Sequence, residues 1–468
     1  MNGKHITKLG FEKRAIALAL TAAALRETAG LDRAAILAEL EGVRADPDAH
    51  LNHPTYAELA REVATQLGEQ SARAGVALHP DPLPYRVWGE ALIEPGARAQ
   101  MDVAMRLPVS VTGALMPDAH VGYGLPIGGV LATEGAVIPY GVGVDIGCSM
   151  RLSVLPLAPD ALDTREEVGL LQKHTRFGAG VGWERRDRRD HAVLDEPIWE
   201  ELPLLRHLHD KAVTQIGTSG SGNHFVEFGT LTLDAPDLGL EAGRYLAVLS
   251  HSGSRGFGAQ VAGHFTRLAE GLHPNLDPAA RKLAWLDLAS EEGQTYWAAM
   301  GLAGRYALAN HEQIHVRIAD ALKVKPLATV TNSHNLAWEQ TLPDGRTVVV
   351  HRKGATPAAA GQLGVIPGSM ADPGYVVRGR GEPQSLASAS HGAGRQLGRK
   401  AAERSLAKRD VQAYLQERGV TLIGGGIDEA PQAYKRIGEV MAAQTDLVDV
   451  VASFTPRVVR MDTGHEDI

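Results

Sequence analysis

Residues 79–85 read HPDPLPY and hold three prolines within seven positions. Because proline fixes its own backbone angle and restricts the residue before it, no helix or central strand can run through this segment. The segment therefore reads as a linker between two parts of different character. We expect residues 1–80 to form a helical N-terminal extension, and residues 81–468 to form a separate and much larger catalytic domain.

The part before the linker is rich in Ala, Leu, Glu and Arg, with apolar positions that recur at helical spacing. The periodicity predicts helices over 11–28, 31–43 and 55–67. The longest apolar run near the start, 15–25, is too short to span a bilayer. We therefore interpret it as a helix of a cytoplasmic protein that does not enter a membrane.

The part after the linker has a different texture, with short β-type runs punctuated by glycine and longer helical patterns. The pattern predicts strands over 129–133, 150–155, 245–250, 328–331, 347–351 and 375–377. It predicts helices over 259–272, 291–322, 394–418 and 431–444. The expected fold class is α/β (mixed α+β), in which central β-sheets are flanked by helices within one large domain.

Composition excludes several classes of protein. Hydrophobic residues make up 44% of the chain and charged residues 22%, which is ordinary globular usage and disfavours wholesale disorder and coiled coil. The single cysteine, Cys148, permits neither an intramolecular disulfide nor a zinc ribbon of paired cysteines. The net charge of -8 does not favour a polyanionic partner, so a nucleic-acid site would have to be a local patch.

The lone cysteine lies in GVGVDIGCSM, which begins at Gly141 and places Asp145 three residues before Cys148. A buried free cysteine usually serves as a small hydrophobic side chain. A carboxylate at this spacing, in a loop that glycines let approach a ligand closely, can instead coordinate the same cation as a thiolate. Both interpretations remain open from this segment alone.

Three further loops each place a histidine among Gly, Ser and Asn residues. GSGNHFVEF contains His224, SHSGSRGFG contains His251 and TNSHNLAWE contains His334. A single loop histidine usually faces solvent or caps a turn, but three of them beside Asp145 and Cys148 favour a metal site assembled from separate strand ends. Five ligands exceed a closed zinc site and a thiolate can bridge, which allows two catalytic metals. Ligand softness alone favours zinc over manganese.

Two other segments carry candidate chemistry. SASHGAGRQLGRKAAERS places His391 in a glycine loop before a strongly helical pattern. A helix N-terminus there would seat a phosphate that His391 could attack, or His391 would merely cap the helix. PDAHVGYGLPIGGV places Asp118 and His120 beside a glycine-rich turn. That pair is either a metal or proton-transfer site, or a turn-capping Asp beside a solvated His.

Seven motifs occur in one order between Tyr85 and Val459: DIGC, GSGNHF, HSGSRG, HNLAWE, VHRKGAT, PGSM and HGAGR. Together they resemble the motifs of the RtcB family of RNA-splicing ligases. The resemblance implies a ligase that uses GTP and manganese to join RNA 3'-phosphate or 2',3'-cyclic phosphate ends to 5'-hydroxyl ends, in tRNA splicing or RNA repair. Some family members use a small activating protein, so the resemblance admits one as a partner.

The resemblance also implies roles for individual residues. Cys148 would bridge two manganese ions, one of them also held by Asp145 and His224, and the other by His251 and His334. His391 would be the nucleophile that takes GMP from GTP. The implied nucleotide-binding positions are Asn223, His224, Phe225, Val226, Glu227, His334, Asn335, Pro367, Gly368, Ser369, Met370, His391, Gly392, Ala393 and Gly394.

Basic residues inside these motifs are candidate phosphate clamps: Arg255, Arg352, Lys353 and Arg395. The arginine-rich run over 185–189 is either an RNA-facing patch or a solvated loop in which aspartates balance the charge.

The chain departs from the family pattern in three places. Gly374 stands where the family commonly has a serine, and Arg460 stands near the family's C-terminal lysine, which reaches the guanylate. The helical extension lies outside the usual family core. Two other functions are therefore kept beside the ligase: a dinuclear metal-dependent RNA-end phosphoesterase that needs no GTP, and an RNA-end binder with a vestigial centre.

Overall fold

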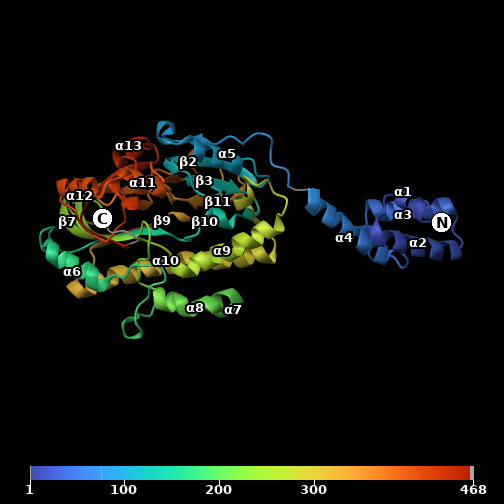
Figure 1. The fold of residues 1–468 in the computed structure, drawn as a ribbon, viewed down its shortest axis with the longest axis horizontal. Helices are drawn as coiled ribbons and strands as arrows, with labels where there is room; N and C mark the ends of the chain where they lie inside the picture. The colour runs from blue at the N-terminus through green and yellow to red at the C-terminus, as the bar shows by residue number, and fades with distance from the viewer. Residues whose placement is uncertain (1, 75, 464–468) are drawn as a thin grey trace. The chain divides into compact units, whose positions relative to one another are not determined.

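The structure is a computed structural model that describes residues 2–74 and 76–463 (Figure 1). The chain divides into two compact units, one made of residues 1–77 with 273–277 and the other of residues 78–272 with 278–468. Among the described residues, no helix combines the length and the apolarity that a membrane crossing requires.

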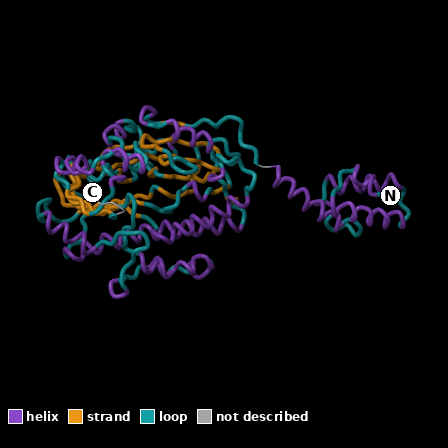
Figure 2. Tube along the Cα trace, in the orientation of Figure 1, coloured by secondary structure: helices purple, strands orange, loops and turns teal. Residues whose placement is uncertain are grey.

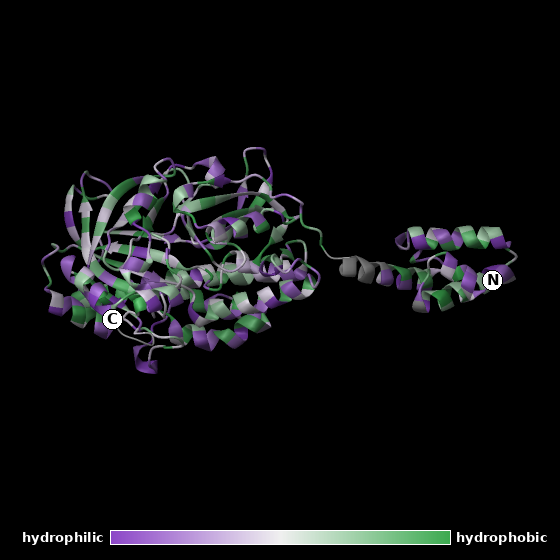
Figure 3. Ribbon diagram, turned by 45° about the horizontal axis from the view of Figure 1, so that its top comes forward, coloured by the Kyte–Doolittle hydropathy of each residue, from purple (hydrophilic) through white to green (hydrophobic). Residues whose placement is uncertain are grey.

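The smaller unit is helical. Its helices are α1 (Gly3–Lys8), α2 (Lys13–Thr28), α3 (Arg33–Ala45) and α4 (Ala57–Ala74). Hydrophobic and hydrophilic residues alternate along the ribbons (Figure 3), and the apolar ones meet in a separate core that includes Phe11, Ile36 and Leu40. The three predicted helices are confirmed, whereas α1 was not expected. Asn2 supports α1 by accepting a hydrogen bond from the backbone N–H of His5.

The larger unit is built on two main sheets (Figure 2). In spatial order, the first contains β1 (Arg86–Val87), β2 (Ser110–His120), β3 (Ile127–Thr133), β11 (Thr347–Lys353) and β10 (Asn335–Thr341). The second contains β13 (Leu363–Ile366), β14 (Gly374–Gly379), β17 (Val448–Met461), β6 (Phe225–Leu233), β7 (Gly243–Ser252), β5 (Ser149–Val154) and β9 (Ala328–Ser333), with β16 (Thr421–Ile423) beside β17. The two edge strands of this second sheet are linked by a side chain. The side-chain amide of Asn332 in β9 donates to the carbonyl of Val365 in β13 and accepts from the N–H of the same residue.

Two small sheets and nine helices complete the described part of this unit. The sheets pair β12 (Ala355–Pro357) with β15 (Ser388–Ser390), and β4 (Ala136–Val137) with β8 (Leu286–Asp287). The helices are α5 (Pro95–Ala104), α6 (Thr164–His174), α7 (Ile198–Glu201), α8 (Pro203–Gln215), α9 (Arg255–Leu272), α10 (Glu291–Leu322), α11 (Arg399–Ser405), α12 (Lys408–Glu417) and α13 (Ile437–Ala442). The predicted fold class, a mixture of helices and central sheets, is confirmed.

Side-chain alternation divides the residues of the larger sheet between two hydrophobic cores. Val226 and Phe228 of β6 pack in one core with Ile314 and Ile318 of α10, while Leu231 packs in the other. Helix α10 runs beside α9 (Figure 1). It spans the predicted range of residues 291–322, because strong signals mark both ends. The Ser290 side chain accepts a bond from the N–H of Gly293, and Lys323 adopts the left-handed conformation that ends a helix.

The predicted helix over 394–418 is wrong in its first part and broken in its second. Residues 395–397 are not helical: Arg395 forms an isolated β-bridge with Tyr434, and the N–H groups of Gln396 and Leu397 donate to the carbonyl of Ala433. The first helix, α11, begins only at Arg399, and a break at 406–407 separates it from α12. The predicted helix over 431–444 is likewise reduced to α13 and a short 3-10 turn.

Candidate active site

Four neighbouring strands of the larger sheet bring the predicted metal ligands to one edge. Cys148 directly precedes β5 and His224 directly precedes β6, whereas His251 lies near the end of β7 and His334 directly follows β9. The strand order is β6-β7-β5-β9 and every pair is antiparallel. The starts of β5 and β6 therefore lie beside the ends of β7 and β9, which is why residues far apart in sequence meet.

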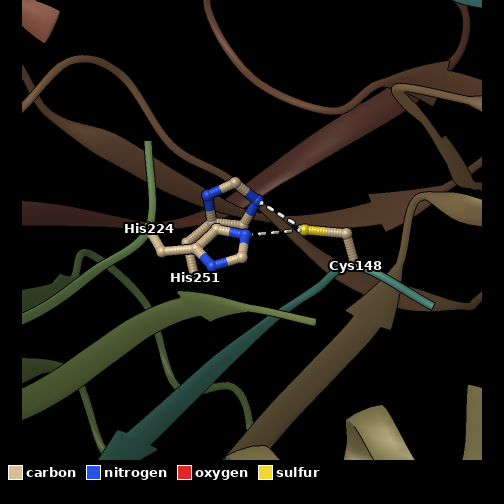
Figure 4. Close-up of side chains that lie close together, drawn as sticks. All are labelled: Cys148, His224 and His251. Atoms are coloured by element: carbon tan, nitrogen blue, oxygen red, sulfur yellow. Dashed lines mark hydrogen bonds between the residues drawn. The ribbon is translucent and has the colours of Figure 1, made fainter. Parts of the chain in front are cut away.

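The ligand atoms themselves converge. The Sγ atom of Cys148 lies 3.1 Å from Nε2 of His251 and 3.5 Å from Nε2 of His224 (Figure 4). Nε2 of His224 lies 3.0 Å from Oδ2 of Asp145, and Nε2 of His251 lies 3.2 Å from Nε2 of His334. All five predicted metal ligands are thus linked by contacts between atoms that can donate an electron pair to a cation.

Backbone carbonyls fix the orientation of two of these imidazoles. Nδ1 of His224 lies 2.8 Å from the carbonyl oxygen of Ser219, and Nδ1 of His251 lies 3.0 Å from that of Asn223. Because a carbonyl only accepts, each Nδ1 carries a proton, so Nε2 of each ring is the atom that could bind a cation beside Cys148. This arrangement is typical of metal-ligating histidines.

Burial sets the protonation of the cluster. It lowers the pKa of His251 and of His334 well below the ordinary value, which keeps both imidazoles in the neutral, ligating form. Burial, together with the charge of Asp145, raises the pKa of the Cys148 thiol well above its ordinary value. A cation is what would make this thiol lose its proton at neutral pH, since metal binding displaces protons from cysteine ligands. The donor set therefore fits a divalent cation.

A glycine makes room for the acidic ligand. Gly253 follows β7, and a Cβ atom at this position would lie 2.2 Å from both carboxylate oxygens of Asp145. The next residue, Ser254, donates its backbone N–H to Oδ1 of Asp145 at 3.1 Å. The glycine in HSGSRG is therefore required by the close approach of Asp145, which reaches the cluster from the DIGC loop.

The predicted nucleophile, His391, is hydrogen-bonded to the buried carboxylate of Asp118. Nδ1 of His391 lies 2.6 Å from Oδ2 of Asp118, and the backbone N–H of His391 donates to the same oxygen at 3.0 Å. The side chain of Asp118, at the end of β2, is fully buried. Burial would raise the pKa of this carboxyl, but His391, Lys435 and His120 hold it below its ordinary value. Asp118 is thus ionised at neutral pH, and Nδ1 of His391 carries the shared proton.

Because Nδ1 of His391 is taken up by this pairing, Nε2 is the ring nitrogen that could act as the nucleophile. The ring of His391 lies 5.0 Å from the ring of His334, measured between centroids. The nucleophile candidate therefore adjoins the metal cluster. The expected phosphate seat at a helix N-terminus is wrong, because α11 begins eight residues beyond His391 and residues 395–397 between them are not helical.

A cavity of about 920 Å³ opens over the cluster and His391. Its walls include all five predicted metal ligands and most of the predicted nucleotide-binding residues: Asn223, Phe225, Asn335, Pro367, Gly368, Ser369, Met370, His391, Gly392, Ala393 and Gly394. Two predicted nucleotide-binding residues do not line it. Val226 packs in the core against α10, and Glu227 is buried within β6, where burial raises its pKa well above the ordinary value.

The basic candidates fall into two groups. Lys353 and Arg395 line the cavity. Arg352 is turned into the protein, where its guanidinium donates to the hydroxyl of Ser388 and the carbonyl of Leu386, and Arg255 is buried against Thr218. The two that line the cavity also have partners within the protein, because Arg395 pairs with Glu429 and Nζ of Lys353 donates to the carbonyl of Tyr123.

Arg460 does not take the place of the family lysine. Its guanidinium donates to the carbonyl of Leu171 at 2.6 Å and stacks over Phe177, whereas the neighbouring residue Met461 lines the cavity. In the arginine-rich run, Arg186 pairs with Glu184 and Arg189 pairs with Asp320, as in a solvated loop.

Several residues of the cavity wall were not predicted from the sequence: Tyr123, Tyr140, Arg399, Glu429 and Tyr434. Tyr123 belongs to the segment PDAHVGYGLPIGGV that contains Asp118 and His120. The neighbouring residues in the sequence do not indicate that its side chain lines the cavity. Glu429 and Arg399 form an ion pair, and the spacing of 30 residues between them gives no signal in the sequence.

Comparisons with known proteins place these features in a family. The sequence model described as tRNA-splicing ligase RtcB matches residues 100–462. The chain is 33% identical to RNA-splicing ligase RtcB of Escherichia coli strain K12, covering 79% of this chain and 95% of that relative. It is 34% identical to RNA-splicing ligase RtcB of Mycobacterium tuberculosis, covering 73% and 94%. It is 32% identical to tRNA-splicing ligase RtcB of Thermococcus kodakarensis, covering 76% and 88%.

Proposed function

The chain belongs to the tRNA-splicing ligase RtcB family, and from this membership we propose that it is a GTP- and manganese-dependent RNA ligase. It would join an RNA end that carries a 3'-phosphate or 2',3'-cyclic phosphate to an end that carries a 5'-hydroxyl. The relatives are named for RNA or tRNA splicing, and RNA repair would use the same joining reaction.

The observation that carries this proposal is the pair formed by His391 and Asp118 at the wall of the cavity. In the first step, Nε2 of His391 attacks the α-phosphorus of GTP, a P–N bond forms and pyrophosphate leaves. The imidazole becomes positively charged in this step, and the ionised carboxylate of Asp118 at Nδ1 stabilises that charge. The carboxylate also holds the ring in one orientation.

Two further steps would complete the reaction. An oxygen of the RNA 3'-phosphate attacks the GMP phosphorus, the P–N bond breaks and His391 returns to its neutral form. The 5'-hydroxyl of the other RNA end then attacks the 3'-phosphate, the new phosphodiester forms and GMP leaves. A cyclic phosphate must first take up water to give a free 3'-phosphate. Activation by GMP is needed because an unmodified phosphate has no good leaving group.

Asp145, Cys148, His224, His251 and His334 would hold the two manganese ions. The choice of manganese rests on the family, since soft thiolate and imidazole ligands by themselves favour zinc. When bound, the ions supply positive charge that neutralises the phosphoryl oxygens. The chain has a net charge of -8, so the positive charge of the bound ions would attract RNA and GTP to the site.

The test uses two short RNAs, one ending in a 3'-phosphate and one beginning with a 5'-hydroxyl, incubated with the protein, manganese and GTP. The proposal expects a joined product that requires GTP and is absent for His391→Ala. Release of inorganic phosphate without GTP would instead identify the RNA-end phosphoesterase. RNA binding without either product would identify a binding protein.

A further inference from the structure

An aromatic side chain stands in solvent at the wall of the cavity. Tyr123 lies in the connection 121–126 between β2 and β3, lines the cavity and is 73% exposed. Val121 and Val144 line the same cavity and are also exposed. Among the exposed large hydrophobic side chains of the described residues, Tyr123 has the greatest exposed fraction. Exposed apolar side chains that gather at a cavity indicate a binding surface.

The backbone beneath this side chain is held in place. The N–H of Val121 donates to Oε1 of Glu94 at 2.7 Å. Gly122 exchanges two hydrogen bonds with the side-chain amide of Gln100, and the carbonyl of Tyr123 accepts from Nζ of Lys353. Three side chains thus fix the backbone of a loop in which the side chains of Val121 and Tyr123 are exposed. A surface that is rigid before its ligand arrives loses little entropy on binding.

The same loop is linked to the nucleophile. Lys353, which holds the carbonyl of Tyr123, is followed by Gly354, and a Cβ atom on Gly354 would lie 3.1 Å from Cε1 of His391. Nζ of Lys353 also lies 4.7 Å from the ring centre of Tyr140, another residue of the cavity wall. Lys353, whose pKa burial lowers to about 7, thus connects the aromatic residues Tyr123 and Tyr140 of the cavity wall to the segment beside the reacting imidazole.

Aromatic rings interleaved with cations are the standard surface for single-stranded RNA, because bases stack on the rings while the cations meet the phosphates. We propose that Tyr123 is a stacking platform for the base of the nucleotide at the RNA end that is being joined. The inference rests on the proposed function and adds to it how the RNA end is held. Stacking needs the ring and not the hydroxyl group, so phenylalanine should serve as well as tyrosine.

The test measures binding of fluorescently labelled RNA to the manganese-loaded protein without GTP, at one fixed salt concentration. One RNA ends in a 3'-phosphate, a second begins with a 5'-hydroxyl, and each is made again with an abasic terminal nucleotide. The variants are Tyr123→Ala, Tyr123→Phe and, as a control for loss of an exposed apolar side chain outside the cavity wall, Val450→Ala.

We expect Tyr123→Ala to raise the Kd of at least one intact RNA about tenfold, as loss of one stacked base does. Tyr123→Phe and Val450→Ala should stay within about twofold of the wild type. The abasic form of the same RNA should bind the wild type weakly and respond little to Tyr123→Ala, since the partner of the ring is missing. Whichever intact RNA responds identifies the end that stacks.

Three results would contradict the stacking role of Tyr123. The Tyr123→Ala variant could bind both intact RNAs as the wild type does, or the substitution could weaken the binding of intact and abasic RNA equally. The substitution could also slow labelling of the protein by GTP in the absence of RNA as much as it weakens RNA binding. That result would mean that the ring of Tyr123 contacts GTP and not the RNA end. Failure of the wild type to become labelled by GTP would count against the proposed ligase, whereas the RNA-binding comparison tests Tyr123 separately.

Discussion

Nδ1 of His391 lies 2.6 Å from Oδ2 of Asp118, a residue 273 positions earlier in the chain. The carboxylate also accepts the backbone N–H of His391, so it fixes the ring and the loop that carries it. Lys435 helps to hold the position of Asp118, because its Nζ donates to the carbonyls of Pro117 and Ala119 on either side. The proposed role of His391 depends on this pair more than on any other contact.

Replacement of Asp118 by asparagine should show whether the negative charge of this side chain, and not only its size, is needed for the reaction. Asp118→Asn keeps the size of the side chain but cannot stabilise a positive imidazole, so we expect labelling of the protein by GTP to slow by at least about 100-fold. The rate is measured from the covalent GMP that accumulates in single-turnover reactions. Asp102→Asn is the control, because Asp102 accepts from Tyr85 outside the cavity wall. Labelling of Asp118→Asn within twofold of the wild type would remove Asp118 from the reaction.

Removal of the single thiol should reduce metal binding without unfolding the chain. Cys148→Ala deletes one small side chain at the cavity wall, so we expect the free energy of unfolding without metal to change by less than about 1 kcal/mol. Manganese retained after desalting, measured by mass spectrometry, should fall from two ions to one or none, and GTP labelling should be lost. Ser333→Ala, at the neighbouring strand end, should retain both ions. Two tightly held ions on Cys148→Ala would contradict a bridging thiolate.

Arg460 should matter for stability and not for the nucleotide. Its guanidinium donates to carbonyls at the end of α6 and in the next turn, so Arg460→Ala should lower the free energy of unfolding by about 1 to 3 kcal/mol. The KM for GTP in the labelling reaction should stay within about twofold of the wild type. A tenfold rise in that KM for Arg460→Ala, with unchanged stability, would mean that Arg460 reaches the nucleotide.

Glu167 should make the stability of the protein depend on pH. Burial raises the pKa of this carboxyl to about 7 from an ordinary value of 4.5, even though Arg457 lies 3.1 Å away and opposes the shift. The folded chain therefore holds a proton that the unfolded chain releases, so the free energy of unfolding should fall as pH rises from about 5 to about 7.

Glu167→Gln cannot lose this proton, and urea unfolding at pH 5 and pH 8 should show a smaller fall than in the wild type. Glu166→Gln, on the exposed face of the same helix, is the matched control, since glutamine can keep the capping bond to Asp163. An equal fall in the wild type and in Glu167→Gln would show that this carboxyl does not set the pH dependence.

The sequence alone predicted local features well. Helix α10 has the bounds that its helical periodicity predicted. The resemblance drawn from seven ordered motifs is confirmed by the family match over residues 100–462. Glycine placement was informative where it reported a close approach, as at Gly253 beside Asp145.

Features that depend on contacts between residues far apart in the sequence could not be predicted. The segment before α11 has a helical sequence pattern, but the bridge between Arg395 and Tyr434 keeps it out of a helix, and no local pattern encodes a partner 39 residues away. Asp118 was singled out, yet its partnership with His391 depends on the meeting of β2 with the loop after β15. Val226 alternates with Phe225 along β6 and so faces the core, a distinction that a motif of consecutive letters does not make.

The most direct test of the account is covalent labelling by GTP. The wild-type protein, incubated with manganese and GTP labelled on the α-phosphate, should acquire acid-labile GMP, because a P–N bond to histidine is broken by acid. His391→Ala should acquire none, whereas His264→Ala, which changes a histidine of α9 outside the cavity wall, should label like the wild type. Absence of label on the wild type, or undiminished label on His391→Ala, would contradict the account.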